Sequence, residues 1–432
     1  MSEVSVSYEK FELSNGLDVI FHEDHSVPIV AVNVWYHVGS AREKPGRTGF
    51  AHLFEHMMFQ GSENVAENEH FRSIQGVGGN LNGSTAEDRT NYWETVPSNY
   101  LEMALWLESD RMGFLLPAMT RKKLDNQRDV VKNERRQSYE NRPYGLAWET
   151  MFAALYPSEH PYHWPVIGSM ADLSAAGLED VQGFFKTYYS PNNASLCVGG
   201  DFDPSEAKRW IEKYFGDVPM GRPVKPVAAV RPALKERQRL LLEDQVQLPR
   251  LYLAWHSPAL YGLDDAEMDV LANILSSGKS SRLYKSLVYE KRIAQDVSAF
   301  QDSRELSSLF FIVATAKQGV ALADLESELW TQIEQVREEG PSENEVVRAR
   351  NGVRADFIYS LQSLGGFGGR SDRLNQYNVY VGTPGYFNDD LGRYDKVTVA
   401  GVQRVAKEYL RGDGVIVLTV VPKAESSSLA NP

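Results

Sequence analysis

Two histidines and a glutamate lie close together in an otherwise apolar stretch. The run from Gly49 to Phe59 places His52, Glu55 and His56 among almost exclusively apolar neighbours. On a helix, positions i and i+4 lie about 40° apart around the axis, so both imidazoles project from one face. A helix that is apolar nearly all round is buried. Burying three ionisable groups on it is costly unless their desolvation is compensated, and a divalent metal such as zinc takes these side chains as ligands.

The order His-x-x-Glu-His is the reverse of the His-Glu-x-x-His pattern of zinc-protease helices. In both orders the histidines ligate zinc and the adjacent glutamate is the general base for the metal-bound water. The pattern predicts His52 and His56 as metal ligands and Glu55 as the catalytic base. The alternative is a histidine pair satisfied by core hydrogen bonds, with Glu55 ion-paired elsewhere. Three polar groups at metal-binding spacing on so apolar a helix favour the metal site.

The third ligand has to come from another part of the chain. A helix is expected over residues 121–141, and on it Gln127 and Glu134 share one inward-facing stripe with apolar residues. Glu134 is therefore a candidate ligand. Glu140 and Glu149 lie in the same part of the sequence, and spacing alone does not choose among these carboxylates.

Composition limits the class of protein and of partner. A chain of 432 residues exceeds one ordinary core, which predicts two or more domains. The net charge, 45 − 58 = −13, argues against nucleic acid or anionic lipid as a partner. The single cysteine, Cys197, excludes an intrachain disulfide. No apolar run approaches the length of a membrane span and no signal-peptide pattern is visible, so we expect a soluble cytoplasmic chain, or a periplasmic one if a signal was removed.

The order of expected elements indicates an internal duplication. Strands and helices recur in a similar order on either side of a proline-containing stretch, which favours two copies of an α+β unit. We expect a metal-binding domain over residues 1–216, a linker over 217–238 and a second domain over 239–432. The second copy carries Asp265 to Leu275 where the first has its His-x-x-Glu-His motif, so it holds no second metal site of this kind.

These features together resemble the pitrilysin/insulysin family of zinc metallopeptidases, known as M16. The resemblance is carried by His52 to His56, by Glu134 within Lys-Asn-Glu-Arg-Arg and by the two repeated halves, and it covers essentially the whole chain. More narrowly, the chain is similar to the short bacterial branch related to mitochondrial processing peptidase. The resemblance implies an α+β fold of two homologous α/β-roll halves, each an antiparallel sheet with helices on one side, that form half of a clamshell.

The resemblance also implies roles for particular residues. Glu134 becomes the third ligand of one Zn²⁺ per chain, and it follows His56 by 134 − 56 = 78 residues, a separation close to that of the family. The segment Asn82, Gly83, Ser84 and Thr85 looks like the strand to which the family's peptide substrates add. The expected activity is endoproteolysis of unfolded peptides inside a closed chamber.

Two departures from the family pattern qualify this expectation. Many members carry a glutamate where this chain has Gln127, a neutral residue that can hydrogen-bond near the metal without adding charge. Many active members also carry an arginine and a tyrosine in the second half as an oxyanion clamp, whereas Val288 and Gln295 stand there in this chain. We therefore expect the zinc-bearing subunit of a heterodimer, whose homologous partner supplies the missing pair.

Other function classes make different predictions. A non-catalytic scaffold subunit built on the same fold would bind no zinc and cleave nothing in a Glu55-dependent way. A different metal hydrolase would turn over non-peptide substrates. The retention of His52, Glu55, His56 and Glu134 favours the peptidase over the scaffold, and no sequence feature beyond the metal site supports a different hydrolase.

Overall fold

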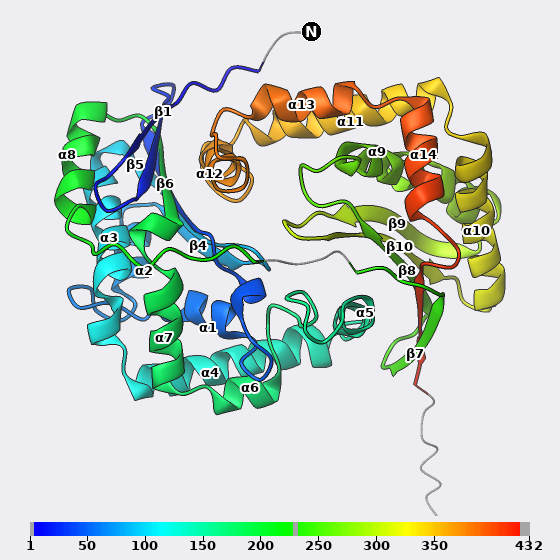
Figure 1. Cartoon of the computed structure of the whole chain (residues 1–432), viewed down its shortest axis with the longest axis horizontal. Coiled ribbons are helices and arrows are strands. Elements are labelled where there is room, and N and C mark those ends of the chain that lie inside the picture. Colours follow the sequence, from blue (N-terminus) through cyan, green and yellow to red (C-terminus); the bar gives the residue numbers. More distant parts are fainter. Residues whose placement is uncertain (1–3, 228–231, 424–432) are drawn as a thin grey trace, which may run out of the picture. The chain divides into compact units, whose positions relative to one another are not determined.

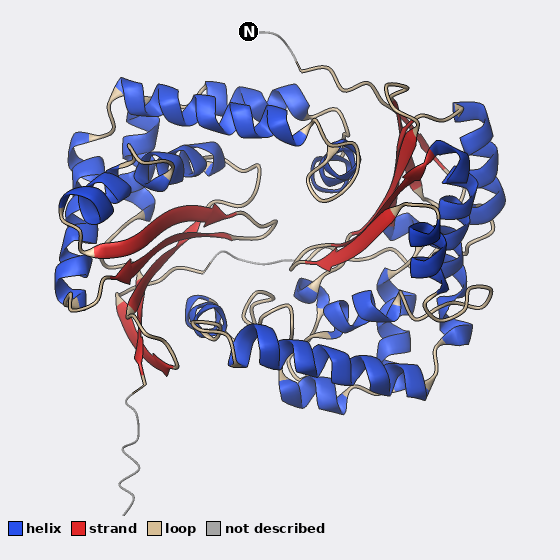
Figure 2. Cartoon of the chain, turned by 180° about the vertical axis from the view of Figure 1, so that it is seen from behind, coloured by secondary structure: helices blue, strands red, loops and turns tan. Residues whose placement is uncertain are grey.

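The computed structural model describes residues 4–227 and 232–423 and contains two separate β-sheets (Figure 2). The first sheet has the strand order β1-β2-β6-β3-β5-β4. Its strands are β1 (Glu9–Glu12), β2 (Asp18–Glu23), β3 (Ile29–Tyr36), β4 (Asn80–Thr85), β5 (Thr90–Pro97) and β6 (Ala194–Gly200). The second sheet has the order β7-β11-β8-β10-β9. Its strands are β7 (Gln238–Asp244), β8 (Arg250–Ser257), β9 (Ala294–Asp302), β10 (Ser308–Ala316) and β11 (Ile416–Pro422).

The two sheets share one topology. Setting β1 aside, both sheets follow the order first, fifth, second, fourth and third strand along the chain. In both, the first and last strands pair in parallel and the remaining pairs are antiparallel. This agreement supports the predicted duplication and confirms the predicted mixed fold class. The helix that follows the second strand is α1 (Phe50–Met57) in the first copy and α9 (Asp265–Ser276) in the second.

Helices cover these sheets in both copies (Figure 1). Those of the first half of the chain are α1, α2 (Glu69–Gly76), α3 (Leu101–Ala118), α4 (Arg121–Arg135), α5 (Ala147–Leu155), α6 (Met170–Ala175), α7 (Leu178–Tyr188) and α8 (Pro204–Phe215). Those of the second half are α9, α10 (Leu322–Glu339), α11 (Glu343–Ser360), α12 (Arg370–Val381), α13 (Phe387–Asp395) and α14 (Val399–Tyr409). The helix predicted over 121–141 is α-helical only to Arg135 and continues as a π-helical turn, Arg136–Glu140.

The described residues group into two compact units, each built from separate parts of the chain. The first comprises Met1–Glu134, Trp164–Ala228 and Ala355–Leu391, and the second comprises Arg135–His163, Ala229–Arg354 and Gly392–Pro432. The expected division at 217–238 treats each half of the chain as one continuous domain. Each compact unit instead contains a segment from the other half of the sequence, Ala355–Leu391 in the first and Arg135–His163 in the second. Residues 228–231 of that linker lie outside the described residues.

The core of the first unit is aromatic and lies between the sheet and α1. Tyr36 of β3 and Tyr92 of β5 point to the same side of the sheet, with ring centroids 6.1 Å apart. Tyr189 contacts Tyr36 at 4.8 Å and also contacts Phe54 of α1 at 4.5 Å. All four side chains are buried. Because this cluster fixes α1 against the sheet, the face of α1 that carries His52, Glu55 and His56, its polar stripe, has a defined position.

Helix α12 covers the opposite face of the same sheet. Side chains alternate along a strand, so Asn33 and Trp35 of β3 point away from Tyr36 and from α1. Both contact Asp372 of α12. The expectation of helices on one side is therefore incomplete for the first sheet, because a helix from the second half of the chain packs on its other face (Figure 1).

A glycine in β6 permits this approach of α12. A Cβ atom on Gly199 would lie 2.5 Å from Ser371 Oγ and 3.2 Å from a methyl of Leu364. We expect Gly199→Ala to lower the free energy of unfolding by about 1–3 kcal/mol, because overpacking forces neighbouring groups to shift. Urea denaturation of the purified chain measures this. Gly183→Ala, in α7 with nothing within 4 Å of the added Cβ, is the control and should be neutral or stabilising. Equal stability of the two variants would contradict the prediction.

Candidate metal centre

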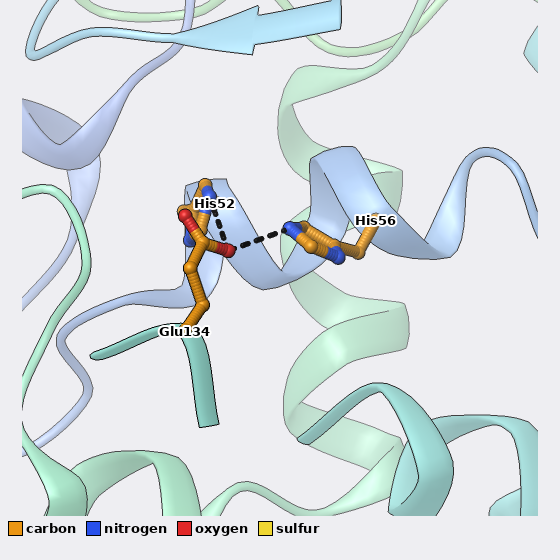
Figure 3. Close-up of side chains that lie close together, drawn as sticks. All are labelled: His52, His56 and Glu134. Carbon is orange, nitrogen blue, oxygen red and sulfur yellow. Dashed lines mark ion pairs between the residues drawn. The ribbon is translucent and has the colours of Figure 1, made fainter. Parts of the chain in front are cut away.

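The three side chains that the sequence predicts as metal ligands meet at the polar stripe of α1. The Nε2 atoms of His52 and His56 lie 3.7 and 3.4 Å from Oε2 of Glu134, which extends from the last turn of α4. Figure 3 shows one ring nitrogen of each histidine directed at this carboxylate. One ligand atom from each of the three residues falls within 4.8 Å of the others. The edge of a tetrahedron around a zinc ion with ligands at about 2.0–2.1 Å measures about 3.3 Å. The two measured separations are close to this edge length, so His52, His56 and Glu134 would fit as the protein ligands of a zinc ion.

The electrostatics of the three groups agree with metal ligation. Burial lowers the pKa of His52 to about 4, and the neighbouring His56 acts in the same direction. Burial also opposes the charged form of His56, but its hydrogen bond with Glu134 and the charge of Glu55 raise its pKa. The same bond with His56 lowers the pKa of Glu134. If a metal cation replaced the proton in the hydrogen bond between His56 and Glu134, both imidazoles would be neutral and Glu134 would be a carboxylate. These are the protonation states that metal binding requires.

Glu55 lies beside this group and is held by the neighbouring edge strand. Its Oε2 accepts a hydrogen bond of 2.7 Å from Thr85 Oγ1 of β4. Burial raises the pKa of Glu55, and the bond from Thr85 acts against that increase. Gly83 allows the close approach, because a Cβ there would lie 3.3 Å from both Cγ and Oε1 of Glu55. The strand predicted to bind substrate therefore also contacts the predicted base.

The other predicted site residues have definite places. Gln127 is buried and its side chain hydrogen-bonds His56. Asn82, in the predicted substrate segment, is exposed, and its Oδ1 accepts from the N–H of Gly83. The segment belongs to β4, which is the edge strand of the first sheet and, within residues 4–227 and 232–423, pairs with β5 alone.

The alternative carboxylates have another partner. Glu140 and Glu149 form ion pairs with Arg135, at 3.4 and 2.7 Å. Arg135 directly follows Glu134, yet the structure assigns Glu134 to the first unit and Arg135 to the second. The π-helical turn begins one residue later, and such turns are frequent at functional sites. Of the three candidates, Glu134 is the one brought to the histidines.

A second group of metal-binding residue types is buried in the first unit. His70, Glu94 and Glu108 place one ligand atom each within 4.8 Å of one another. Here, however, Arg111 Nε donates to Glu108 at 2.8 Å, and the guanidinium packs over Tyr92. Burial and the neighbouring Glu108 raise the pKa of Glu94 well above its ordinary value. An enclosed group that already contains a guanidinium repels a further cation, so we assign it to the core.

Sequence reasoning missed Glu43, which caps the metal-site helix. This buried carboxylate accepts from the backbone N–H groups of Gly49 and Ala51, at 2.9 and 2.7 Å. Burial raises its pKa to about 8, against the effect of these donors. It precedes α1 by several residues, so the usual capping position next to the helix gave no signal.

Comparison with known proteins places the chain in a family. The model described as "Insulinase (Peptidase family M16)" matches residues 18–160, and the model described as "Peptidase M16 inactive domain" matches residues 176–353. The first match contains the candidate metal helix, and the two together span most of the chain. The chain belongs to peptidase family M16. This confirms the resemblance expected from the sequence, and it agrees with a second half that lacks the metal motif.

Relatives of this M16 chain include proteins named as zinc proteases. It is 29% identical over 412 residues to "Zinc protease PqqE" of Helicobacter pylori, a match that covers 94% of this chain and 90% of that protein. The crystal structure of a protease from Helicobacter pylori is similar at a TM-score of 0.88 and 26% identity, over 97% of this chain and all of that one. The periplasmic protease PqqL from Escherichia coli shares the fold at a TM-score of 0.79 and 17% identity, and this chain corresponds to 48% of it.

The helices of the M16 chain include none with the length and apolar character of a membrane span, within residues 4–227 and 232–423.

The capping role of Glu43 can be tested by its removal. Glu43→Ala leaves two buried backbone N–H groups without their acceptor, so we expect a loss of about 1–3 kcal/mol in the free energy of unfolding. Thermal and urea denaturation measure it. Glu63→Ala, which changes an exposed glutamate a few residues beyond α1, is the control and should alter stability by less than about 0.5 kcal/mol. A Glu43 variant as stable as this control would show that the cap contributes nothing.

Proposed function

We propose that this chain is a zinc-dependent endopeptidase that cleaves unfolded peptides, and that it is the zinc-bearing subunit of a heterodimer. The observation that supports the activity best is the convergence of His52, His56 and Glu134 at near-tetrahedral spacing, with Glu55 beside them. Membership of family M16 and relatives named as zinc proteases support the choice of metal and reaction. One Zn²⁺ per chain is expected.

Each residue of the centre has a distinct task in this proposal. His52, His56 and Glu134 hold the metal, and Gln127 orients His56 through its hydrogen bond. Zinc in this position supplies a Lewis acid and lowers the pKa of water toward about 7. Glu55 accepts the proton of the attacking water and passes it to the departing amine. Thr85 keeps the carboxylate of Glu55 in place during both transfers.

The proposed substrate site is the open edge of β4. An extended peptide that pairs with Asn82, Gly83, Ser84 and Thr85 continues the sheet and uses main-chain hydrogen bonds, which depend little on side-chain identity. Gly83 lies against Glu55, and the side chain of Thr85 bonds to it. A peptide bond that pairs with β4 beside these two residues therefore lies close to the base. Such binding requires an extended segment, which agrees with unfolded peptides as the substrate class.

The proposed partner follows from the second half of the chain. Val288 packs against the apolar core of the second unit, and Gln295 is an exposed residue of β9. Neither residue can donate the charged or phenolic hydrogen bonds of an oxyanion clamp. A homologous chain that carries arginine and tyrosine at these places would supply them. A homodimer would not, because both copies lack the pair.

A non-catalytic scaffold is the second candidate. The match of residues 176–353 to a domain described as inactive favours it, although the metal-site residues all precede that range. Zinc content and Glu55-dependent cleavage separate the two candidates.

Metal binding and the role of the base can be tested separately. The wild-type chain and Glu55→Gln should each hold about one zinc per chain, and His56→Ala should hold far less, because it loses one of three ligands. Elemental analysis after dialysis against a weak chelator measures this. In the assembled peptidase, Glu55→Gln should lower kcat by about 10²–10⁴-fold. Retained activity would refute the role of Glu55, and a zinc-free wild type would favour the scaffold.

The need for a partner can be tested by reconstitution. The purified zinc-loaded chain should cleave an unstructured fluorogenic peptide negligibly, and a homologous chain with the arginine and tyrosine should restore cleavage. Replacing that arginine in the partner should cost about 10²–10³ in rate, as for loss of one oxyanion donor. Brisk Glu55-dependent turnover by this chain alone would mean that Val288 and Gln295 are no handicap and that no partner is needed.

A further inference from the structure

The C-terminal half of the chain contributes a buried carboxylate to the first unit. Asp372 of α12 is buried against the first sheet. Its Oδ1 accepts hydrogen bonds from Trp35 Nε1 at 2.7 Å, Asn91 Nδ2 at 2.8 Å and Asn33 Nδ2 at 3.3 Å. Its Oδ2 accepts from the N–H of Gly368 at 2.8 Å. One side chain therefore collects donors from β3, from β5 and from the loop before its own helix.

These contacts follow a row of residues that crosses the sheet. Ser195, Trp35, Asn91 and Ser84 are successive register partners on β6, β3, β5 and β4. Because register partners point to the same face, all four side chains face α12. The row ends at the edge strand β4, the proposed substrate strand.

Asn91 carries the contact from Asp372 to that edge strand. Its Nδ2 is bound to Asp372, which fixes the orientation of its amide and turns Oδ1 toward β4. This Oδ1 accepts from Ser84 Oγ at 2.7 Å and from Arg89 Nη1 at 3.1 Å. The same guanidinium nitrogen donates to the backbone carbonyl of Ser84 at 2.9 Å. Ser84 is therefore held through both its side chain and its backbone.

The next residue of β4 points to the opposite face and holds the base. Thr85 donates to Glu55, so β4 is fastened to α12 on one face and to α1 on the other. An edge strand has one neighbouring strand instead of two. Its position consequently depends more on side-chain contacts than that of a central strand.

We propose that Asp372 is a positioning residue for the active site: through Asn91 and Ser84 it fixes β4, and thereby Thr85 and Glu55. The proposal rests on the proposed peptidase function for its effect on catalysis, but its structural part concerns β4 alone. It gives the C-terminal half a task in the metal centre although that half has no metal motif of its own.

The substitution Asp372→Asn tests the proposal with little change in shape. An amide has one oxygen, whereas both carboxylate oxygens of Asp372 accept hydrogen bonds. In one orientation the new NH₂ group faces the N–H of Gly368, and in the other it faces the donors of Trp35, Asn91 and Asn33. Either way a buried donor is opposed by another donor, so the alignment of Asn91 is lost.

The matched control is Asp390→Asn. Asp390 is also a buried aspartate of the segment Ala355–Leu391, and it accepts a hydrogen bond of 2.6 Å from Tyr377. None of the contacts that join α12 to Asn91 and Ser84 passes through it. It reports what loss of a buried carboxylate in this segment does in general.

The experiment combines hydrogen exchange with kinetics. In Asp372→Asn, peptides covering Asn80–Thr85 should exchange at least about 10-fold faster than in the wild type, because local opening becomes easier. In the assembled peptidase, kcat should fall about 10- to 100-fold while zinc content stays at the wild-type level, since a small misplacement of a catalytic group has effects of this size. Asp390→Asn should match the wild type in β4 exchange and in kcat.

Asn91→Ala is the second variant, and it removes the middle of the path without altering α12. It should accelerate β4 exchange as Asp372→Asn does, and the combined variant should show little further change. Wild-type exchange of β4 in both single variants would overturn the proposal, as would an equal effect of Asp390→Asn. A wild type without peptidase activity in any assembly would refute the proposed function instead, and the exchange comparison would still decide whether Asp372 positions β4.

Discussion

The cost of desolvating ionisable groups governs the first unit. Helix α1 packs five of its eight residues into the core, and the same turns bring His52, Glu55 and His56 out of bulk water. Each of these groups has a polar partner in the fold. Glu134 lies between the two imidazoles, and Thr85 donates a hydrogen bond to the carboxylate of Glu55. A divalent cation held by His52, His56 and Glu134 would compensate the burial of both imidazoles through coordination bonds, while Glu55 keeps its hydrogen bond from Thr85. The aromatic cluster behind α1 matters because it keeps these groups from escaping to solvent.

Strand β4 connects this centre with the rest of the unit. It is an edge strand, and an exposed edge is normally a liability that proteins cover or blunt. In the described part of the chain no second strand pairs with β4, while both faces of the strand are held, one by Glu55 and one by the polar network of α12. A strand held in this way keeps its backbone groups available without becoming mobile. That combination suits a surface that binds extended chains.

The two copies of the duplicated unit carry different features. Both sheets have the same strand order, so the second copy retained the scaffold. Helix α9 has the same place in the second copy as α1 has in the first. It packs almost wholly into an apolar core that contains Trp255 and Phe310. What the second half supplies instead is the segment Ala355–Leu391, which folds onto the first sheet. The compact units therefore do not coincide with the two halves of the sequence.

The sequence by itself determined the metal-site helix, the family, the mixed fold and the absence of a second metal motif. Those features depend on residue types at short, regular spacing, such as the two histidines and the glutamate on one helical face, or on the repetition of whole segments. The family resemblance implied Glu134 as the third ligand, but residue spacing alone left Glu140 and Glu149 open, and the tertiary structure brings Glu134 to the histidines and pairs the other two with Arg135. It also decided that Glu43 caps α1, that Thr85 binds Glu55 and that Asp372 reaches Asn91. These contacts join residues that are distant in the chain, and a single polar residue far from its partner carries no periodic or spacing signal. Their partners are set by which strands pair and which helix covers which face, and that is a property of the folded chain alone.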